Sequence, residues 1–142
     1  MLTVIDFQPE HLKEFVLQDG QAYMQGYISQ PGYGEWLASA GGARTVLVDG
    51  RIIAVAGIAE IWPGRGSAWV LMAADAGRHL LALHRAVRAF LDKCGVRRVE
   101  CYVDRDFMAG HRWVHMLGFR REGLMRAFGA HGGDMVMYAR VD

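Results

Sequence analysis

The stretch GHRWVHMLGFRREG, residues 110–123, constrains the fold of this chain more than any other feature. It runs from an amphipathic helix through a Leu-Gly-Phe turn into a strand. Gly118 stands at this turn, and glycine is the residue that most often follows the last turn of a helix. A helix that leads directly into a strand indicates a fold in which helices pack on a sheet.

The periodicity elsewhere predicts an α/β fold with a mixed, mainly antiparallel central sheet flanked by helices. The Asp49-Gly50 turn between two apolar runs predicts a hairpin, and Pro31-Gly32 breaks a helical region. Residues 62–66 (WPGRG) are expected to break the chain. Strands are expected at 2–7, 44–48, 52–58, 68–72, 98–103 and 135–141, and helices at 11–18, in two pieces within 21–40, at 78–93 and at 107–117.

Length and composition bound the number of domains and the class of partner. With 142 residues and 52% hydrophobic content, we expect residues 1–142 to form a single domain. The net charge is +1 and both signs are mixed, which predicts no nucleic-acid or membrane partner. The chain has two cysteines and nothing near Met1 is typical of an export signal, so we expect a cytoplasmic location.

The end of the chain, with Gly118 and Phe119 in the turn, resembles the last part of the GNAT superfamily of acyl-CoA-dependent N-acetyltransferases. The predicted order of elements is also that of the GNAT fold. The resemblance implies a GNAT-like sheet whose strands splay apart at a cofactor cleft. It further implies transfer of an acetyl group from acetyl-CoA to a primary amine, on a small molecule or a peptide, by direct attack.

In this family the pyrophosphate of coenzyme A binds to backbone N–H groups at a helix start, in a loop of type Gln/Arg-x-x-Gly-x-Gly/Ala. A helix start offers unpaired donors and a partial positive charge. Asp75 and Met72 depart from the pattern, and Asp75 is expected to accept hydrogen bonds from these amides as an N-cap. The resemblance places acetyl-CoA at Met72, Ala73, Ala74, Gly77, Arg78 and His79.

Acetylation of an amine needs a general base and an acid that protonates the leaving thiolate. The family often places a tyrosine acid where this chain has Val114, and His111 lies one turn earlier on the same helix face. Glu60 and Glu100 are the candidate bases. An apolar strand is expected to raise the pKa of Glu100 toward neutrality, although strand alternation could equally turn Glu100 to solvent.

A second interpretation is a non-catalytic GNAT-like interaction or virion-assembly protein of bacteriophage origin, with a degenerate coenzyme A loop. The motifs at 62–66 and 110–113 carry the resemblance to phage proteins. Free amides at 73–78 in an open cleft would favour the enzyme. An Asp75 cap, with Met72 and Trp113 filling the cleft, would favour the interaction protein.

Two further expectations concern metals and oligomers. His111 and His115 have the i, i+4 spacing of helical metal ligands, but no third ligand has a recognisable spacing, so no metal site is predicted. The apolar residues of the final strand predict a homodimer formed through that strand as a sheet edge. These residues are Met135, Val136, Met137 and Tyr138.

Overall fold

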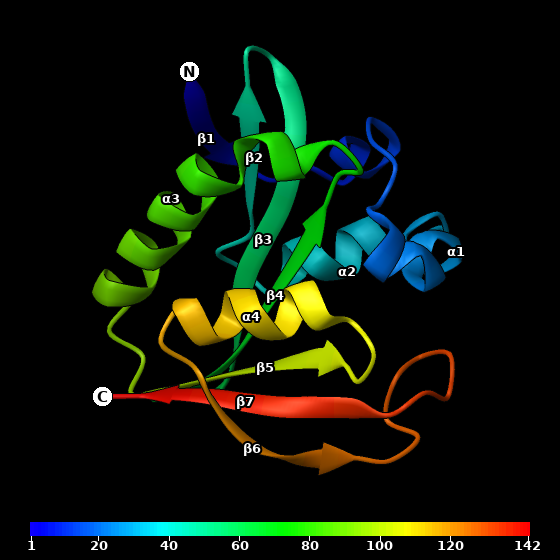
Figure 1. Cartoon of the computed structure of the whole chain (residues 1–142). Coiled ribbons are helices and arrows are strands. Elements are labelled where there is room, and N and C mark those ends of the chain that lie inside the picture. The colour runs from blue at the N-terminus through cyan, green and yellow to red at the C-terminus, as the bar shows by residue number, and fades with distance from the viewer.

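Seven strands form one sheet in the computed structural model, which describes all residues from 1 to 142. The strands are β1 (Leu2–Asp6), β2 (Arg44–Val48), β3 (Arg51–Trp62), β4 (Arg65–Met72), β5 (Arg98–Asp104), β6 (Arg120–Met125) and β7 (Met135–Val141). Their order across the sheet is β1-β2-β3-β4-β5-β7-β6 (Figure 1). All neighbouring strands are antiparallel except β4 and β5. The predicted mixed, mainly antiparallel sheet is therefore confirmed.

Helices connect and cover the strands, and α4 lies across β5 in Figure 1. The α-helices are α1 (Gln25–Ile28), α2 (Tyr33–Ser39), α3 (Leu80–Lys93) and α4 (Met108–Met116). Three 3₁₀ helices, η1 (Pro9–Lys13), η2 (Asp19–Met24) and η3 (Ala76–His79), precede or join them. None of the helices has the length and apolar character that a membrane span requires.

The centre of the core is β3, which reads as an apolar run from Ile52 to Val55. All four of these residues are buried, and Ala54 and Val55 have no exposed surface. A continuous apolar run is expected where a strand is covered on both faces. Leu83 of α3 is also completely buried in the same core of 27 residues. The predicted hairpin and the long central helix are thus held together by apolar burial.

The helix predicted over residues 11–18 is wrong. The helical part is the short η1, and the chain after it runs toward the end of β4. There Leu17 forms an antiparallel bridge with Ala73, and the Val16 carbonyl accepts a hydrogen bond from the Ala74 amide at 2.7 Å. Backbone groups that bond to another strand cannot also close helical turns, so the helix ends early.

The predicted chain break at residues 62–66 is a hairpin turn. Strand β3 continues to Trp62, which pairs with Arg65 at the start of β4. Gly64 adopts φ +90° in the turn, a conformation that glycine adopts without steric cost. The strand predicted over 68–72 therefore begins at Arg65, and β3 and β4 form one long antiparallel pair.

The final strand is not the sheet edge that the dimer prediction required. Strand β7 pairs with β5 on one side and with β6 on the other, so its backbone groups are used within the chain. The edges of the sheet are β1 and β6. Within this chain β7 is therefore not an edge, and the homodimer through the final strand stays a prediction.

We expect Gly34→Ala to lower the free energy of unfolding by about 1–3 kcal/mol, the usual cost of overpacking. A Cβ atom at Gly34 would lie 2.8 Å from the Cβ and 2.9 Å from the Cα of Pro9. Gly26→Ala is the matched control, because nothing lies within 4 Å of a Cβ there and Gly26 is in α1. Urea unfolding followed by circular dichroism measures both. Equal stability of the two variants would contradict the packing of α2 on η1.

Candidate functional site

Strands β4 and β5 pair only at their first residues. The parallel register joins Arg65–Ser67 to Arg98–Glu100 and stops there. Beyond this point β4 continues to Met72 and β5 continues to Asp104, but the two strands no longer pair with each other. Their ends diverge in Figure 1. The splayed strands that the GNAT resemblance implied are therefore present, and the polar backbone groups along both inner edges need other partners.

The side chain of Gln21, from η2, bonds to the inner edge of β4. Its Nε2 donates to the carbonyl oxygen of Val70 at 2.6 Å, and its Oε1 accepts from the amide of Met72 at 3.0 Å. One side-chain amide thus satisfies a donor and an acceptor of the strand, as a neighbouring strand would. The sequence gives no sign of this role, because nothing in the residue pattern relates Gln21 to β4.

The backbone before η2 completes the cover of this edge. The amide of Gln18 donates to the carbonyl of Met72 at 2.9 Å, and the amide of Ala74 donates to the carbonyl of Val16 at 2.7 Å. Together with Gln21, these contacts place residues 16–21 along the end of β4. We call residues 16–21 the edge segment. The inner edge of β4 from Val70 to Ala74 is therefore closed by the chain itself.

The loop between β4 and α3 retains two free amides. The amide of Ala73 donates to the carbonyl of Ile53 at 2.9 Å, and that of Ala74 to the edge segment. The amides of Asp75 and Gly77 have no hydrogen-bond partner within the chain. Gly77 is exposed, and nothing lies within 4 Å of the position of a Cβ there. The loop offers donors at Asp75 and Gly77.

Asp75 does not act as the N-cap that the sequence predicted. Its carboxylate makes no capping hydrogen bond and instead forms an ion pair with Arg51, at the start of β3. The guanidinium supplies the charge and the donors that the helix amides would otherwise supply. The expectation that Asp75 blocks the helix start through its side chain is therefore wrong.

A pocket of about 520 Å³ lies beside this loop. It is lined by residues 14–16, by Gly50 with the first two residues of β3, and by residues 73–75. Ala73 and Ala74, two predicted cofactor residues, thus border open space. Met72 is buried in the core, at 6% exposure. Gly77, Arg78 and His79 form the start of the helical region in η3, where the first two are exposed and His79 is half-buried.

Glu100 is buried in β5 and is held by two guanidinium groups. Arg65 donates to its two carboxylate oxygens at 2.7 and 2.9 Å, and Arg98 donates at 2.7 Å. These hydrogen bonds, that from Arg65 above all, lower the pKa of Glu100 to about 2 despite its burial. The expectation of a raised pKa for Glu100 is therefore wrong, since its ion pairs outweigh the apolar surroundings.

Glu60 lies on β3, which continues past it to Trp62. Its side chain is exposed, and Oε1 accepts a hydrogen bond from the amide of Gly64 at 3.2 Å. Glu60 is opposite Gly66, in the part of β4 that still pairs with β5. The structure thus places Glu60 at the closed end of the splay and does not bring it to the open end.

His111 is fixed from both sides of its ring. Its Nδ1 lies 2.7 Å from the hydroxyl oxygen of Tyr138, and its Nε2 lies 2.9 Å from the carbonyl oxygen of Arg105. Because a carbonyl only accepts, Nε2 carries the proton, and Nδ1 of the neutral ring accepts from the tyrosine hydroxyl. His111 therefore faces β7 (Tyr138), and β5 lies between β7 and β4. Val114, at the position of the family's tyrosine, is buried.

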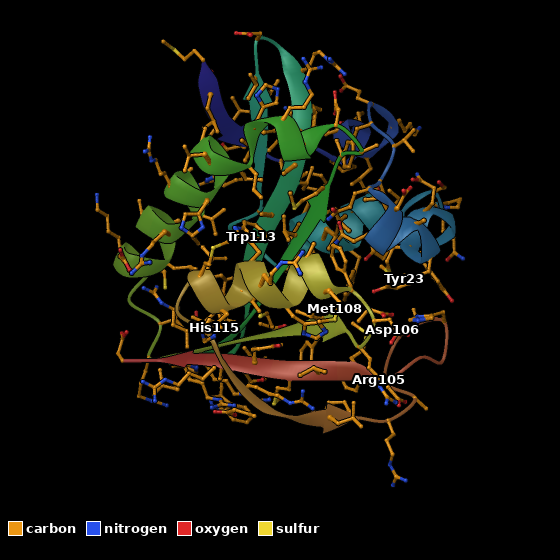
Figure 2. The ribbon with its side chains drawn as sticks, in the orientation of Figure 1. Tyr23, Arg105, Asp106, Met108, Trp113 and His115 are labelled. Atoms are coloured by element: carbon orange, nitrogen blue, oxygen red, sulfur yellow. The ribbon has the colours of Figure 1, made fainter.

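No group of three or more His, Cys, Asp or Glu side chains lies close enough to hold a metal ion. His115, at the end of α4 away from Met108 in Figure 2, is exposed. Trp113, also labelled there, is buried and donates from Nε1 to Nδ1 of His84 at 3.2 Å. This bond ties α4 to α3.

Comparison with known proteins rests on structure alone, because no protein-family model and no curated protein matches the sequence. The ribosomal-protein-S18-alanine N-acetyltransferase from Escherichia coli matches with a TM-score of 0.69 at 18% identity, over 99% of this chain and 94% of its own. A GNAT-family acetyltransferase from Bacillus anthracis gives 0.70 at 13% identity, with 99% and 94% covered. The ribosomal L7/L12 α-N-protein acetyltransferase RimL, solved with coenzyme A, gives 0.72 at 17%, with 99% and 93% covered.

This chain has the GNAT fold. The turn that suggested this fold from the sequence is present, since α4 ends at Met116, Gly118 adopts φ +96°, and β6 begins at Arg120. Phe119 is 2% exposed and anchors the start of β6 in the core. The GNAT fold thus follows the predicted order of elements, whereas the expected bacteriophage origin has no support among these structures and stays a prediction.

Sequence reasoning missed three groups in and near the candidate site. Gln21 bonds to β4, Arg65 and Arg98 bind Glu100, and Tyr138 bonds to His111. The sequence identified Tyr138 only as an apolar residue of the final strand and did not reveal its partner. Charge alone identified Arg65 and Arg98 as basic, without showing that they converge.

Proposed function

We propose that this protein is an acyl-CoA-dependent N-acyltransferase that moves an acetyl group from acetyl-CoA to a primary amine. The observation that carries the proposal is the splay of β4 from β5, which opens beside a loop with two free amides, at Asp75 and Gly77. The likeness to acetyltransferase structures, among them RimL with coenzyme A, supports it. The acceptor is an amine on a small molecule or a peptide.

The start of η3 is suited to bind the pyrophosphate of the cofactor. Amides at a helix start and flexible cationic side chains both bind phosphate oxygens. Arg78 is exposed and makes no ion pair, so its guanidinium is free for such a contact, and His79 is next to it. The charge of Asp75 is balanced by Arg51, which reduces its repulsion of the phosphates.

Direct attack requires a neutral amine, an electrophilic thioester and a proton for the leaving thiolate. Among the predicted catalytic residues, Glu100 is the least suited as a base, because its pKa is lowered to about 2 by Arg65 and Arg98. Glu60 and His111 stay predictions for the base and the acid. Unchanged turnover in His111→Ala would remove His111 from this role.

Acetyl-CoA cannot enter the splay without a change at the edge segment. Thioester and amide groups that lie along β4 need its backbone donors, yet the amide of Met72 already bonds to Gln21. Each such bond contributes about 0.5–1.5 kcal/mol net, so the segment opposes binding by a limited amount. In the proposed mechanism acetyl-CoA displaces the Gln21 side chain and takes over its bonds.

A second candidate function is a non-catalytic interaction protein, of the kind the degenerate loop suggested. The closed inner edge of β4 favours it, as do Met72 and Trp113, which are both buried in the core. In this case the GNAT fold serves only as a scaffold, since a fold by itself does not determine an activity. The edge segment would then be a permanent part of the sheet.

Calorimetric titration with acetyl-CoA and with free coenzyme A tests the first candidate. We expect micromolar binding by the wild type, and about tenfold weaker binding by Arg78→Gln through loss of a charge-assisted contact. Lys93→Gln, at the last residue of α3 and far from η3 along the chain, is the control and should bind like the wild type. Folded wild-type protein that binds neither compound at millimolar concentration would favour the interaction protein.

A further inference from the structure

A second pocket, of about 420 Å³, lies outside the splay. It is bordered by the first turn of α4 with the preceding loop, by β6 and by β7. Strand β5 separates β7 from β4, so this pocket is not part of the proposed cofactor site. Figure 2 labels two of its lining residues, Arg105 and Met108, where the chain enters α4. We call it the α4–β6 pocket.

The charged groups that line the α4–β6 pocket are cationic. The side chain of Arg121 makes no ion pair or hydrogen bond within the chain, and Arg121 is exposed. Arg105 contacts a carboxylate oxygen of Asp134 at 3.3 Å, and its side chain remains 61% exposed. No carboxylate lines the pocket itself. An unpaired guanidinium with a second one across the pocket favours an anionic ligand, and a carboxylate matches the fork of Arg.

The rest of the pocket combines a rigid floor with an apolar wall. The floor is the pair of His111 and Tyr138, whose polar atoms are held by the 2.7 Å contact between them and by the Arg105 carbonyl. The wall includes Met108 and Leu124, which are 59% and 42% exposed. Covering such apolar surface contributes about 25 cal/mol per Å². A ligand that covers both side chains therefore gains affinity without reordering the floor.

We propose that the α4–β6 pocket binds a small carboxylate with an apolar body. The carboxylate contacts the guanidinium groups of Arg121 and Arg105, and the apolar body packs on Met108 and Leu124. Ligand pockets typically combine apolar walls with a few convergent polar groups, as here. This site uses none of the residues of the β4–α3 loop; the residue that it shares with the acyltransferase proposal is His111, the predicted acid.

Titration of the full chain with phenylacetate, followed by NMR, tests the proposal. Phenylacetate should bind saturably and shift signals of His111 and Tyr138, and phenylacetamide, which has the same shape without the charge, should bind at least tenfold more weakly. Arg121→Gln should weaken phenylacetate binding about tenfold, the loss of one charge-assisted contact. Arg120→Gln is the matched control, because Arg120 is exposed on the same strand and does not line the pocket.

Two results would overturn this site. One is equal binding of phenylacetate and phenylacetamide, or no binding of either. The other is an equal loss of affinity in Arg120→Gln and Arg121→Gln, which would show general charge attraction. Repeating the titration with saturating coenzyme A separates the two sites. We expect the affinity for phenylacetate to be unchanged. Competition between the two compounds would place phenylacetate in the splay and exclude the α4–β6 pocket.

Discussion

Glu100→Gln will lower the free energy of unfolding by about 3 kcal/mol, the low end of the usual cost of removing one partner from a buried ion pair. The carboxylate of Glu100 is 2% exposed and receives hydrogen bonds from Arg65 and Arg98. With a neutral amide these two guanidinium groups face each other, and only the Glu122 carboxylate beside Arg98 remains as a counter-charge. They are 26% and 28% exposed, so water relieves part of the repulsion, which is why we expect the low end.

Glu122→Gln is the matched control for this prediction. Glu122 accepts hydrogen bonds from Arg98 but is 39% exposed, and surface ion pairs contribute at most about 1 kcal/mol. Denaturant unfolding at neutral pH compares both variants with the wild type. Similar losses in Glu100→Gln and Glu122→Gln would contradict the view that burial makes the Glu100 cluster strong.

The dependence of stability on pH provides an independent check of Glu100. The pKa of Glu100 falls from 4.5 to about 2 on folding, so its contribution is fully present above pH 4.5 and is lost as pH falls toward 2. A shift of this size corresponds to roughly 3 kcal/mol, at about 1.4 kcal/mol per pKa unit. The stability difference between wild type and Glu100→Gln should therefore shrink over this range. A constant difference would contradict the lowered pKa.

Gln21→Ala will strengthen the binding of acetyl-CoA about 5- to 150-fold if the cofactor enters between β4 and β5. The variant removes the hydrogen bonds to Val70 and Met72, each of which contributes about 0.5–1.5 kcal/mol net. The wild type must break both bonds before acetyl-CoA can lie along β4. In the variant these two bonds are absent, and only the backbone bonds of the edge segment to Met72 and Ala74 remain. Calorimetric titration of both proteins measures the change.

Gln30→Ala is the matched control, because Gln30 is exposed and its side chain makes no hydrogen bond within the chain. It should bind acetyl-CoA like the wild type. Weaker binding by Gln21→Ala would show that Gln21 contributes to the cofactor site and does not block it. Absence of binding in wild type and Gln21→Ala alike would favour the non-catalytic function.

Local signals made most of the fold predictable. The Asp49-Gly50 turn, the apolar run of β3 and the Gly118 turn each determine a nearby element through backbone freedom or burial. The errors arose where a distant segment competes for backbone groups. Residues 14–18 lack a helix because β4 binds them, and β4 begins at Arg65 because β3 pairs with it.

The candidate site was less predictable, because its side chains are chosen by partners far away in the sequence. Asp75 was expected to cap its own helix, but Arg51 lies 24 residues before it and binds the carboxylate. Glu100 was expected to be isolated among apolar residues, but Arg65, 35 residues before it, donates two hydrogen bonds. Residue type identified these carboxylates as notable, and only their partners set the pKa of Glu100.

The sequence by itself determined the order of strands and helices and the GNAT-like end of the chain, since these depend on periodicity and turns within a few residues. The tertiary structure alone decided the chemistry of the splay. It brought Gln21 to Val70, 49 residues away, and left the amides of Asp75 and Gly77 free. Hydrogen bonds and ion pairs act over a few ångströms in space, so their partners are known only once the chain has folded.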